Sequence, residues 1–464
     1  MTSTSDRDPS RTLTACVALA VACGTSLCVN TACAQWDPFN GEWGKSDPTD
    51  IRVMTWNVED AIRTENPTKG NQVANWNACV RIVAGMQPDV LILQETADNG
   101  CGGCVDSVSE LETVFDLFFN GGADPFEGGT VTSFVRAYAP DFDMPHVFVS
   151  TVSDGFNRNV ILSRFPFADL NGDGIATNPE VLVIQDAYAP TGVVIRGQAF
   201  AEIDLPDDVY AGDLVVGNAH FKAGGSSDDR EERLEAGQIV AYTIDYLYNG
   251  AGTGLPDPNQ RIPFPSPTMI LDENTPVIWG GDWNEDEATN GRKGPAEWMT
   301  RAEFTGGTDG TDRDRSDSTY DDARDPFNND EDTRGSSKLD YIAWQDSVVE
   351  GVRRQFIFNS ATPPQTAQLP EPLRGFPSAP VIASSVAADH LPVIVDFQLP
   401  LAEPGGCNAA DLAEPFGVLD LADIGAFTSG FLSQNPIADL DPDGVFDLGD
   451  IGVFVGAFLT PCNP

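Results

Sequence analysis

The chain has 464 residues, 71 acidic against 26 basic side chains, and a formal net charge of −45 at pH 7. At roughly 150 residues per domain this length predicts about three units. A hydrophobic content of 41% is enough to bury cores, which excludes disorder throughout. The acidity excludes a basic surface that captures nucleic acid by releasing counterions. Any reaction at a phosphate group therefore needs a metal ion or a few well-placed Arg side chains.

Residues 1–34 read as an export signal. Basic residues precede an apolar run at 13–29, and Ala32-Cys33-Ala34 forms a small-residue cleavage site, so the mature chain would begin at Gln35. A membrane anchor is the alternative, but the run is short for a span of about 20 residues. No second apolar stretch follows, so we expect a secreted or cell-surface protein without a transmembrane segment in the mature chain.

Five cysteines remain after the signal, and in an oxidising compartment most of them should pair. We expect a disulfide between Cys407 and Cys462, and a second one between two of Cys79, Cys101 and Cys104. A zinc site at Cys101-Gly-Gly-Cys104 is less favoured, because no second ligand pair with suitable spacing accompanies it.

The predicted organisation has five parts. They are a signal peptide at 1–34, a polar lead-in at 35–50, a mixed domain of strands and helices at 51–399, a linker at 400–406, and a two-copy repeat at 407–464. Within the mixed domain, apolar periodicity predicts helices at about 71–86 and 227–248. Residues 309–337 are rich in Asp, Arg, Gly and Ser, which predicts a surface loop.

Polar side chains stand at the ends of six apolar runs in the mixed domain. Four runs end in polar groups, at Asn57, Glu95, His220, and Asp282 with Asn284; two begin with them, at Asp340 and at Asp389-His390. In sheets that mix parallel and antiparallel strands, all six ends can meet at one rim. Carboxylates, amides and imidazoles gathered there would form a site for a hard cation with acid and base groups beside it. Taken alone, each of these residues has a simpler explanation, as a residue that forms a turn or as a histidine with a structural role.

These runs belong to a set of motifs that resembles the endonuclease/exonuclease/phosphatase superfamily, which has the DNase I-like fold. The motifs are Thr55-Trp56-Asn57, Leu93-Gln94-Glu95, Asn159-Val-Ile-Leu-Ser163-Arg164, Asn218-Ala-His220-Phe-Lys222, Gly281-Asp282-Trp-Asn284, Leu339-Asp340-Tyr-Ile342 and Asp389-His390-Leu-Pro-Val393. They follow the order of the family across residues 51 to 398. The resemblance implies an α+β domain built as a four-layer α/β/β/α sandwich, and an enzyme that hydrolyses phosphoric esters with Mg²⁺ or Mn²⁺.

The resemblance also implies roles for individual residues. Glu95 would be the principal metal ligand, with Asn57, Glu59 and Asp389 on the metal side. Asp282 and Asn284 would orient or deprotonate the attacking water and hold the phosphate.

The remaining implied roles concern proton transfer and phosphate binding. Asp340 would hydrogen-bond His390 and stabilise its imidazolium form, and His220 would be the acid for the leaving oxygen. Arg158 resembles a phosphate-contacting Arg, with a structural salt bridge as the alternative.

The segment 169–180 has the spacing of an EF-hand calcium loop. Its oxygen ligands at loop positions one, three, five, nine and twelve are Asp169, Asn171, Asp173, Thr177 and Glu180, with Gly174 at position six. We expect a Ca²⁺ ion that stabilises an insertion; the alternative is an acidic turn that binds nothing.

The C-terminal repeat has the same kind of calcium-loop spacing. In the second copy the ligand positions are occupied by Asp439, Asp441, Asp443, Asp447 and Asp450, whereas Leu412 and Phe416 occupy ligand positions in the first. The segment resembles a dockerin, a small all-α calcium-binding module. That implies a cohesin-like or cell-surface docking partner; the alternative is a calcium-stabilised tail without a partner. We expect a monomer.

The leading functional hypothesis is a secreted, metal-dependent nuclease, such as an endonuclease, acting on extracellular DNA or RNA. A sphingomyelinase-type phospholipid phosphodiesterase shares most of the motifs; His220-Phe-Lys222 looks more like the nuclease pattern. A non-catalytic calcium-dependent surface or docking protein is the alternative from another class. The complete set of polar residues at the strand ends argues against a non-catalytic protein.

Overall fold

A computed structural model describes residues 36–59, 62, 76–96, 105, 107–153, 157–168, 196, 198–207, 209–249, 271, 274–289, 318–377, 379–402, 407–413, 416–441 and 445–460. The predicted signal at 1–34 and the predicted calcium loop at 169–180 lie outside these residues. Among the described helices, none has both the length and the apolar character that a membrane span requires.

The larger sheet has six strands in the order β14-β15-β3-β4-β8-β7. Their bounds are β3 Ile51–Asn57, β4 Val90–Gln94, β7 His146–Ser153, β8 Arg158–Ser163, β14 Gly351–Ile357 and β15 Val393–Gln398. β3 and β4 are parallel, and every other pairing in this sheet is antiparallel. The carboxyl ends of β3 and β4 therefore lie at one rim, beside the amino end of β15.

The smaller sheet has five strands in the order β12-β13-β11-β10-β9. Their bounds are β9 Ala199–Ile203, β10 Leu214–His220, β11 Val277–Asp282, β12 Ser318–Tyr320 and β13 Asp340–Gln345. β10 and β11 are parallel, and the other pairings are antiparallel. This arrangement again brings two carboxyl ends beside one amino end, that of β13.

The two sheets pack face to face through an apolar core. The core draws on both sheets, for example Val53 and Val395 from the larger and Val216 and Ile278 from the smaller. Asn218 of β10 bridges the sheets, because its Nδ2 donates to the carbonyls of Leu93 and Val160, both at 2.9 Å. Its Oδ1 accepts from Nε2 of Gln94 at 3.0 Å. A buried amide with these partners fixes how one sheet sits on the other.

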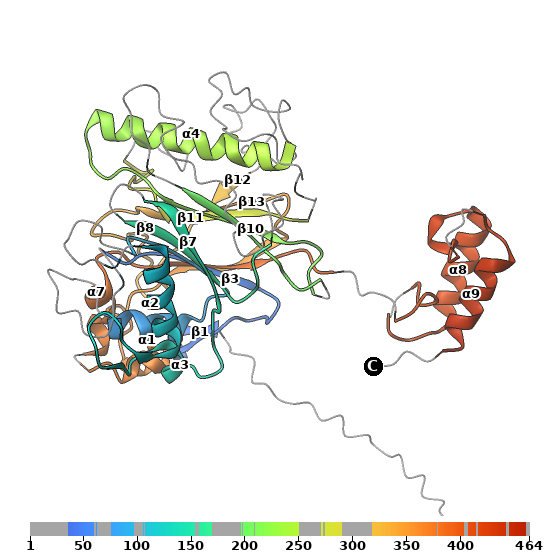
Figure 1. The fold of residues 1–464 in the computed structure, drawn as a ribbon, viewed down its shortest axis with the longest axis horizontal. Coiled ribbons are helices and arrows are strands. Elements are labelled where there is room, and N and C mark those ends of the chain that lie inside the picture. Colours follow the sequence, from blue (N-terminus) through green and yellow to red (C-terminus); the bar gives the residue numbers. More distant parts are fainter. Residues whose placement is uncertain are drawn as a thin grey trace, which may run out of the picture.

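Helices cover both outer faces, which gives the four layers of the predicted sandwich (Figure 1). Five helices pack on the larger sheet through a second apolar core. They are α1 Trp76–Met86, α2 Val108–Asn120, α3 Val135–Tyr138, α6 Glu371–Arg374 and α7 Ala383–Ala387. The long helix α4 Ser227–Asn249 lies on the side of the smaller sheet (Figure 1). Short elements complete this part: β1 Trp36–Asp37, η1 Pro38–Asn40, β2 Glu42–Trp43, β5 Gly122–Ala123, β6 Thr130–Val131, η5 Thr366–Gln368 and η6 Pro380–Ile382.

The predicted lead-in and the predicted surface loop both contribute buried residues. In the predicted lead-in, β1 and β2 form a hairpin, and Trp43 is buried in the core of the helical layer. In the predicted surface loop at 309–337, the described part contains strand β12 and the buried Ala323. The loop prediction is wrong for the strand and for the buried residues of this part, whereas residues 321–337 otherwise form an irregular segment with isolated bridges, as predicted. Asp321 is buried there because its carboxylate accepts hydrogen bonds from Ile342 N and Lys338 Nζ.

The C-terminal repeat forms two helices, α8 Leu421–Ser433 and α9 Leu448–Phe458, with a short η7 Pro436–Ala438 between them. Asp420 and Asp447 cap the two helices in the same way, each accepting a backbone N–H two residues further on. The rings of Phe427 and Phe454 stack with centroids 4.1 Å apart. The described part of the repeat is therefore all-α, and its dockerin character stays a prediction.

Candidate active site

Strand ends of both sheets meet at one rim of the sandwich. β3 ends at Asn57, and Glu95 follows its parallel neighbour β4. His220 and Asp282 end the parallel strands β10 and β11 as a register pair. Asp282 also pairs across the sheet with Asp340, the first residue of the antiparallel β13. The topology thus brings together residues that lie up to about 280 positions apart in the chain.

Two of these carboxylates are held against one amide. Nδ2 of Asn57 donates to Oε1 of Glu95 and to Oδ2 of Asp282, both at 3.0 Å. Oδ1 of Asn57 accepts the backbone N–H of Glu59 at 3.0 Å. One neutral amide cannot compensate two negative charges, so this corner of the site favours a cation.

His390 and Asp340 form the second part of the site. Nδ1 of His390 is 2.7 Å from Oδ2 of Asp340, and Nε2 lies 3.7 Å from Oδ2 of Asp282. The indole N–H of Trp56 donates to the carbonyl of His390 at 3.0 Å and holds its backbone. Burial lowers the pKa of His390, but the Asp340 and Asp282 carboxylates outweigh this effect and raise the pKa to about 10. These carboxylates favour the imidazolium form of the ring, in which Nδ1–H donates to Asp340.

His220 completes the rim and has an unforeseen neighbour. Its Nε2 lies 3.5 Å from Oε1 of Glu95 and 3.6 Å from Oδ2 of Asp282. Arg196 is closer, with Nη1 at 2.6 Å from Nε2 of His220. Arg196 could not be identified from the sequence, because it precedes β9 outside any pattern of polar strand ends.

Three residues at the site have a left-handed backbone, which is uncommon for residues other than glycine. The φ angles of Glu59, Glu95 and Asn284 are 52°, 56° and 54°. Such conformations cost free energy and cluster at functional sites, where the surrounding structure enforces them. For Asn284 the constraint is visible: its backbone N–H donates to Oδ1 of Asp282 at 2.8 Å, and Nδ2 donates to the carbonyl of Phe221 at 3.0 Å.

The turn that carries Asp282 is held tightly from behind. Gly281 has φ 150°, and a Cβ there would lie 1.7 Å from the carbonyl oxygen of Ala219, so only glycine fits. The ring of Trp283 is stacked between Trp279 at 4.2 Å and Tyr341 at 4.7 Å, measured between centroids. A buried ion pair between Arg233 of α4 and Glu285 anchors the residues just after this turn. These contacts fix the position of the Asp282 carboxylate.

The site opens into a cavity of about 270 Å³. The cavity is lined by Glu59, Glu95, Arg196, His220, Ala223, Asp282, Asn284, Arg334, Asp389 and His390. Arg334, which sequence reasoning also missed, donates Nε to Oδ2 of Asp389 at 2.7 Å. Oδ1 of Asp389 lies 3.9 Å from Nε2 of His390. Asp389 therefore lies on the histidine side of the cavity, and its place on the metal side stays a prediction.

The donor set fits a divalent metal ion. Ligand atoms of Glu95, His220 and Asp282 lie within 4.8 Å of one another, and so do those of Asp282, Asp340 and His390. Carboxylate and amide oxygens are the ligands of Mg²⁺ and Mn²⁺. Asn57 lies beside the first cluster, because it donates to Glu95 and Asp282, and Glu59 lines the same cavity.

Arg158 does not line this cavity. It begins β8, and its Nη1 donates to the carbonyl of Ser150 on the neighbouring β7 at 2.9 Å. Its guanidinium therefore contacts the backbone of the neighbouring strand, and the phosphate contact expected for Arg158 stays a prediction. Arg196 and Arg334 are the guanidinium groups at the cavity among the residues that the structure describes.

The cysteines are only partly described. Cys79 is a buried free thiol, and burial raises its pKa to about 12. Of its predicted partners, Cys101 and Cys104 lie outside the described residues, so a bond between those two stays a prediction. Cys407 is disulfide-bonded, and Cys462 lies outside the described residues, so their mutual pairing also stays a prediction.

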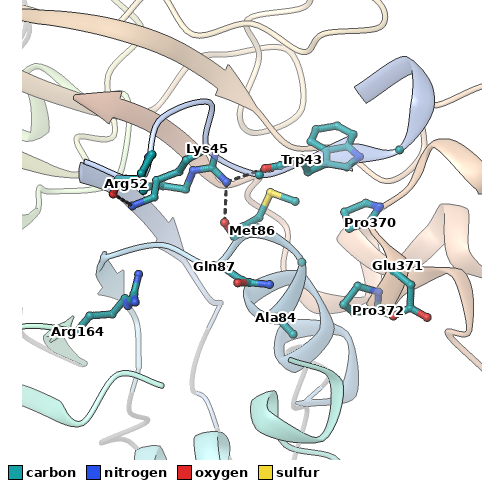
Figure 2. A pocket seen from close by; sticks show the side chains of 14 residues that line it. Trp43, Lys45, Arg52, Ala84, Met86, Gln87, Arg164, Pro370, Glu371 and Pro372 are labelled. Atoms are coloured by element: carbon teal, nitrogen blue, oxygen red, sulfur yellow. Dashed lines mark hydrogen bonds between the residues drawn. The ribbon is translucent and has the colours of Figure 1, made fainter. Parts of the chain in front are cut away.

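A larger cavity of about 460 Å³ lies near the other end of β3 (Figure 2). Its cations are already paired: Lys45 and Arg164 with Asp89, each at 2.7 Å, and Arg52 with Asp396 at 2.6 Å. Arg52 also donates to the carbonyls of Trp43 and Met86 (Figure 2). Size alone therefore does not identify the reactive site, because here the charges compensate one another.

Comparisons with known proteins give matches among solved structures. No family model matches the sequence, and no curated protein is detectably similar. Solved structures that resemble the chain include an endonuclease/exonuclease/phosphatase from Beutenbergia cavernae, with 17% identity, a TM-score of 0.37, and coverage of 76% of this chain and 72% of that one. An endonuclease/exonuclease/phosphatase from Bacteroides vulgatus has 15% identity, a TM-score of 0.39, and coverage of 75% and 99%. The human Nocturnin catalytic domain, with a bound sulfate anion, has 13% identity, a TM-score of 0.39, and coverage of 76% and 95%.

Likenesses at this level carry no functional conclusion, which has to come from the site. The sandwich of two mixed sheets, with acidic, amide and imidazole groups at one rim, is the arrangement that the motif resemblance implied.

Proposed function

We propose that the chain is an exported, divalent-metal-dependent phosphodiesterase that cleaves extracellular DNA or RNA. The observation that supports this most is the convergence at one rim of two strand-end carboxylates, Glu95 and Asp282, with the buried pair of His390 and Asp340. Carboxylates that would hold a cation beside a paired imidazolium suit a reaction in which negative charge builds up on a phosphate.

Glu95 and Asp282 would hold Mg²⁺ or Mn²⁺, with Asn57 and Glu59 beside them. The ion, when bound, stabilises negative charge on the phosphate as a Lewis acid. It also offsets the repulsion between this acidic chain, at −45, and a polyanionic substrate.

The residues of the chain have distinct tasks. Asp282, fixed by Asn57 and by the N–H of Asn284, can accept a hydrogen bond from the attacking water and orient it. His390, whose Nδ1–H is held by Asp340, presents Nε2 to the cavity, where it can donate a proton or a hydrogen bond to phosphate oxygen. Both groups are buried and need little reorganisation during the reaction.

The test uses the mature chain, residues 35–464, with supercoiled plasmid DNA and with RNA. We expect nicking or degradation with Mg²⁺ or Mn²⁺ and none in excess chelator. His390→Ala should lower the rate about 10²- to 10⁴-fold, as loss of an acid–base group does. His146→Ala is the matched control, because His146 lies on β7 outside the cavity. Full activity in chelator, or an unaffected His390→Ala variant, would contradict the proposal.

A substrate panel separates the nuclease from its closest alternative. Duplex DNA, single-stranded DNA, RNA and sphingomyelin vesicles are compared at equal enzyme concentration. We expect hydrolysis of nucleic acid to exceed that of sphingomyelin. The reverse order would assign the chain to the phospholipid phosphodiesterases while leaving the metal and His390 roles intact.

We further propose that the C-terminal repeat binds Ca²⁺ and docks the exported enzyme to a cohesin-like or cell-surface partner. Ligand atoms of Asp439, Asp441 and Asp450 lie within 4.8 Å of one another, which supports a calcium loop in the second copy. Leu421 and Leu448 occupy equivalent positions in the two copies and are 82% and 81% exposed, which supports docking.

Calcium titration of the full chain tests the first part of this proposal, with Asp441→Asn as the variant that should not respond. Binding to immobilised cohesin-type domains tests the second part, with Leu421→Asp/Leu448→Asp as the non-binding control. No calorimetric signal at millimolar Ca²⁺ would contradict the calcium site.

A further inference from the structure

The charges at the cavity single out Arg196. Of the two guanidinium groups that line it among the described residues, that of Arg334 is paired with Asp389 through two nitrogen atoms. Arg196 forms no ion pair with any carboxylate of the described residues, and its recorded partner is Nε2 of His220. A cation that lines an acidic cavity and has no carboxylate partner among the described residues is available to an anionic ligand.

The hydrogen bond between Arg196 and His220 has only one possible direction. A guanidinium carries five N–H donors and no acceptor, so Nη1 of Arg196 donates and Nε2 of His220 accepts. Nε2 therefore presents a lone pair, and not a proton, to Arg196. In this arrangement His220 cannot protonate a leaving oxygen through Nε2, which is the role that the sequence resemblance implied for it.

We propose that Arg196 is the residue that binds the non-bridging oxygens of the substrate phosphate, and that His220 is a positioning residue that holds the guanidinium through Nε2. The inference rests on the proposed phosphodiesterase function. The planar donor fork of a guanidinium matches two oxygens of a phosphate, and one nitrogen held by His220 leaves further N–H groups for this contact. His220 is itself held in place, because it is 3% exposed and ends a central strand.

Kinetics of four variants at the site and one surface control test the division of roles. Arg196→Gln should lower kcat/KM about 10²- to 10³-fold, with a rise in KM, as expected for loss of a charged donor. Arg196→Lys should recover part of this loss. His220→Gln should stay within about tenfold of the wild type, the cost of one weakened hydrogen bond, because the amide oxygen can accept from Arg196. His220→Ala should lose more than His220→Gln, and Arg136→Gln, a surface control, should be unchanged.

Chemical rescue gives a readout that a purely structural role would not affect. Added guanidinium should restore activity to Arg196→Ala, whereas imidazole should not restore His220→Ala. Equal and severe losses in His220→Gln and His220→Ala, with imidazole rescue and a nearly normal Arg196→Gln, would overturn the proposal and restore His220 as the acid.

Nitrogen NMR of the metal-free chain tests the geometry without any activity. The chain has three histidines, so His146→Gln and His390→Gln variants assign the ring signals of His220. We expect Nε2 of His220 to appear as an unprotonated acceptor at pH 7 and to change its shift in Arg196→Gln. A protonated Nε2 in the wild type would overturn the proposal.

Phosphate binding separates this inference from the proposed function. Inorganic phosphate in Mg²⁺ buffer should raise the melting temperature of the wild type and of Arg136→Gln, but not that of Arg196→Gln. If no substrate in the panel is hydrolysed while phosphate binding still depends on Arg196, the proposed function fails and the phosphate role stands. If phosphate binding is the same in Arg196→Gln, the phosphate role fails whatever the substrate.

Discussion

The two ends of strand β3 carry charged and polar groups of the same kinds, yet they are organised in opposite ways. At its amino end, Arg52 and Asp396 form a fully buried bidentate ion pair. The nearby cations Lys45 and Arg164 are both paired with Asp89. At its last residue, Asn57 is the donor that Glu95 and Asp282 share. At the first end the named cations are paired with carboxylates, and these pairs hold the sheet and its helices together. At the other end the carboxylates of Glu95 and Asp282 share one neutral amide, an arrangement that favours a bound cation beside them. The balance of charge, and not its amount or the size of the nearby cavity, distinguishes the reactive rim.

The largest expected effect is on catalysis at the reactive rim. Asp282→Asn keeps the size of the side chain but removes the charge that faces the proposed metal and His390. We expect a fall in rate of about 10⁴-fold, equivalent to about 5.5 kcal/mol, measured as plasmid nicking in saturating Mg²⁺. The unfolding midpoint should change little. A variant within tenfold of the wild-type rate would contradict the placement of Asp282 at the centre of the site.

At the opposite end, the same kind of change should affect stability and not catalysis. Asp396→Asn leaves the buried charge of Arg52 without its partner, which we expect to cost about 3–5 kcal/mol of unfolding free energy in urea. Arg164→Gln is the control, because this arginine is 42% exposed and such pairs contribute at most about 1 kcal/mol. A smaller loss of unfolding free energy in Asp396→Asn than in Arg164→Gln would mean that the pair of Arg52 and Asp396 does not hold the sheet.

The contact between the sheets should show an intermediate effect. Asn218→Ala removes an amide that satisfies the carbonyls of Leu93 and Val160, and we expect a loss of about 1–3 kcal/mol. Gln94→Ala should show coupling with it in a double-mutant cycle, because their side chains are hydrogen-bonded. Additive losses would indicate that the bridge does not act as a unit.

Much of the reactive rim could be predicted from the sequence, because polar residues that end apolar runs mark strand ends. Asn57, Glu95 and Asp282 follow from that pattern, and the pairing of His390 with Asp340 follows from the family motifs. The pattern fails where a residue works outside a strand end, as Arg196 does before β9. It also fails where polar residues are buried by local hydrogen bonds, as Asp321 is in the supposed surface loop. Composition cannot distinguish a solvated carboxylate from one that is bonded to backbone N–H groups.

The smallest expected effect has the opposite sign and tests the comparison most directly. Glu95→Gln preserves an oxygen that can accept from Asn57 but removes one of two facing negative charges. In chelator we expect the free energy of unfolding to rise by about 1 kcal/mol, since like charges at short range repel. In saturating Mg²⁺ the gain should disappear, because the ion stabilises the native wild type by binding to it. Urea unfolding with and without Mg²⁺ measures both values, and a loss of stability in chelator would show that Glu95 is compensated as fully as Asp396 is.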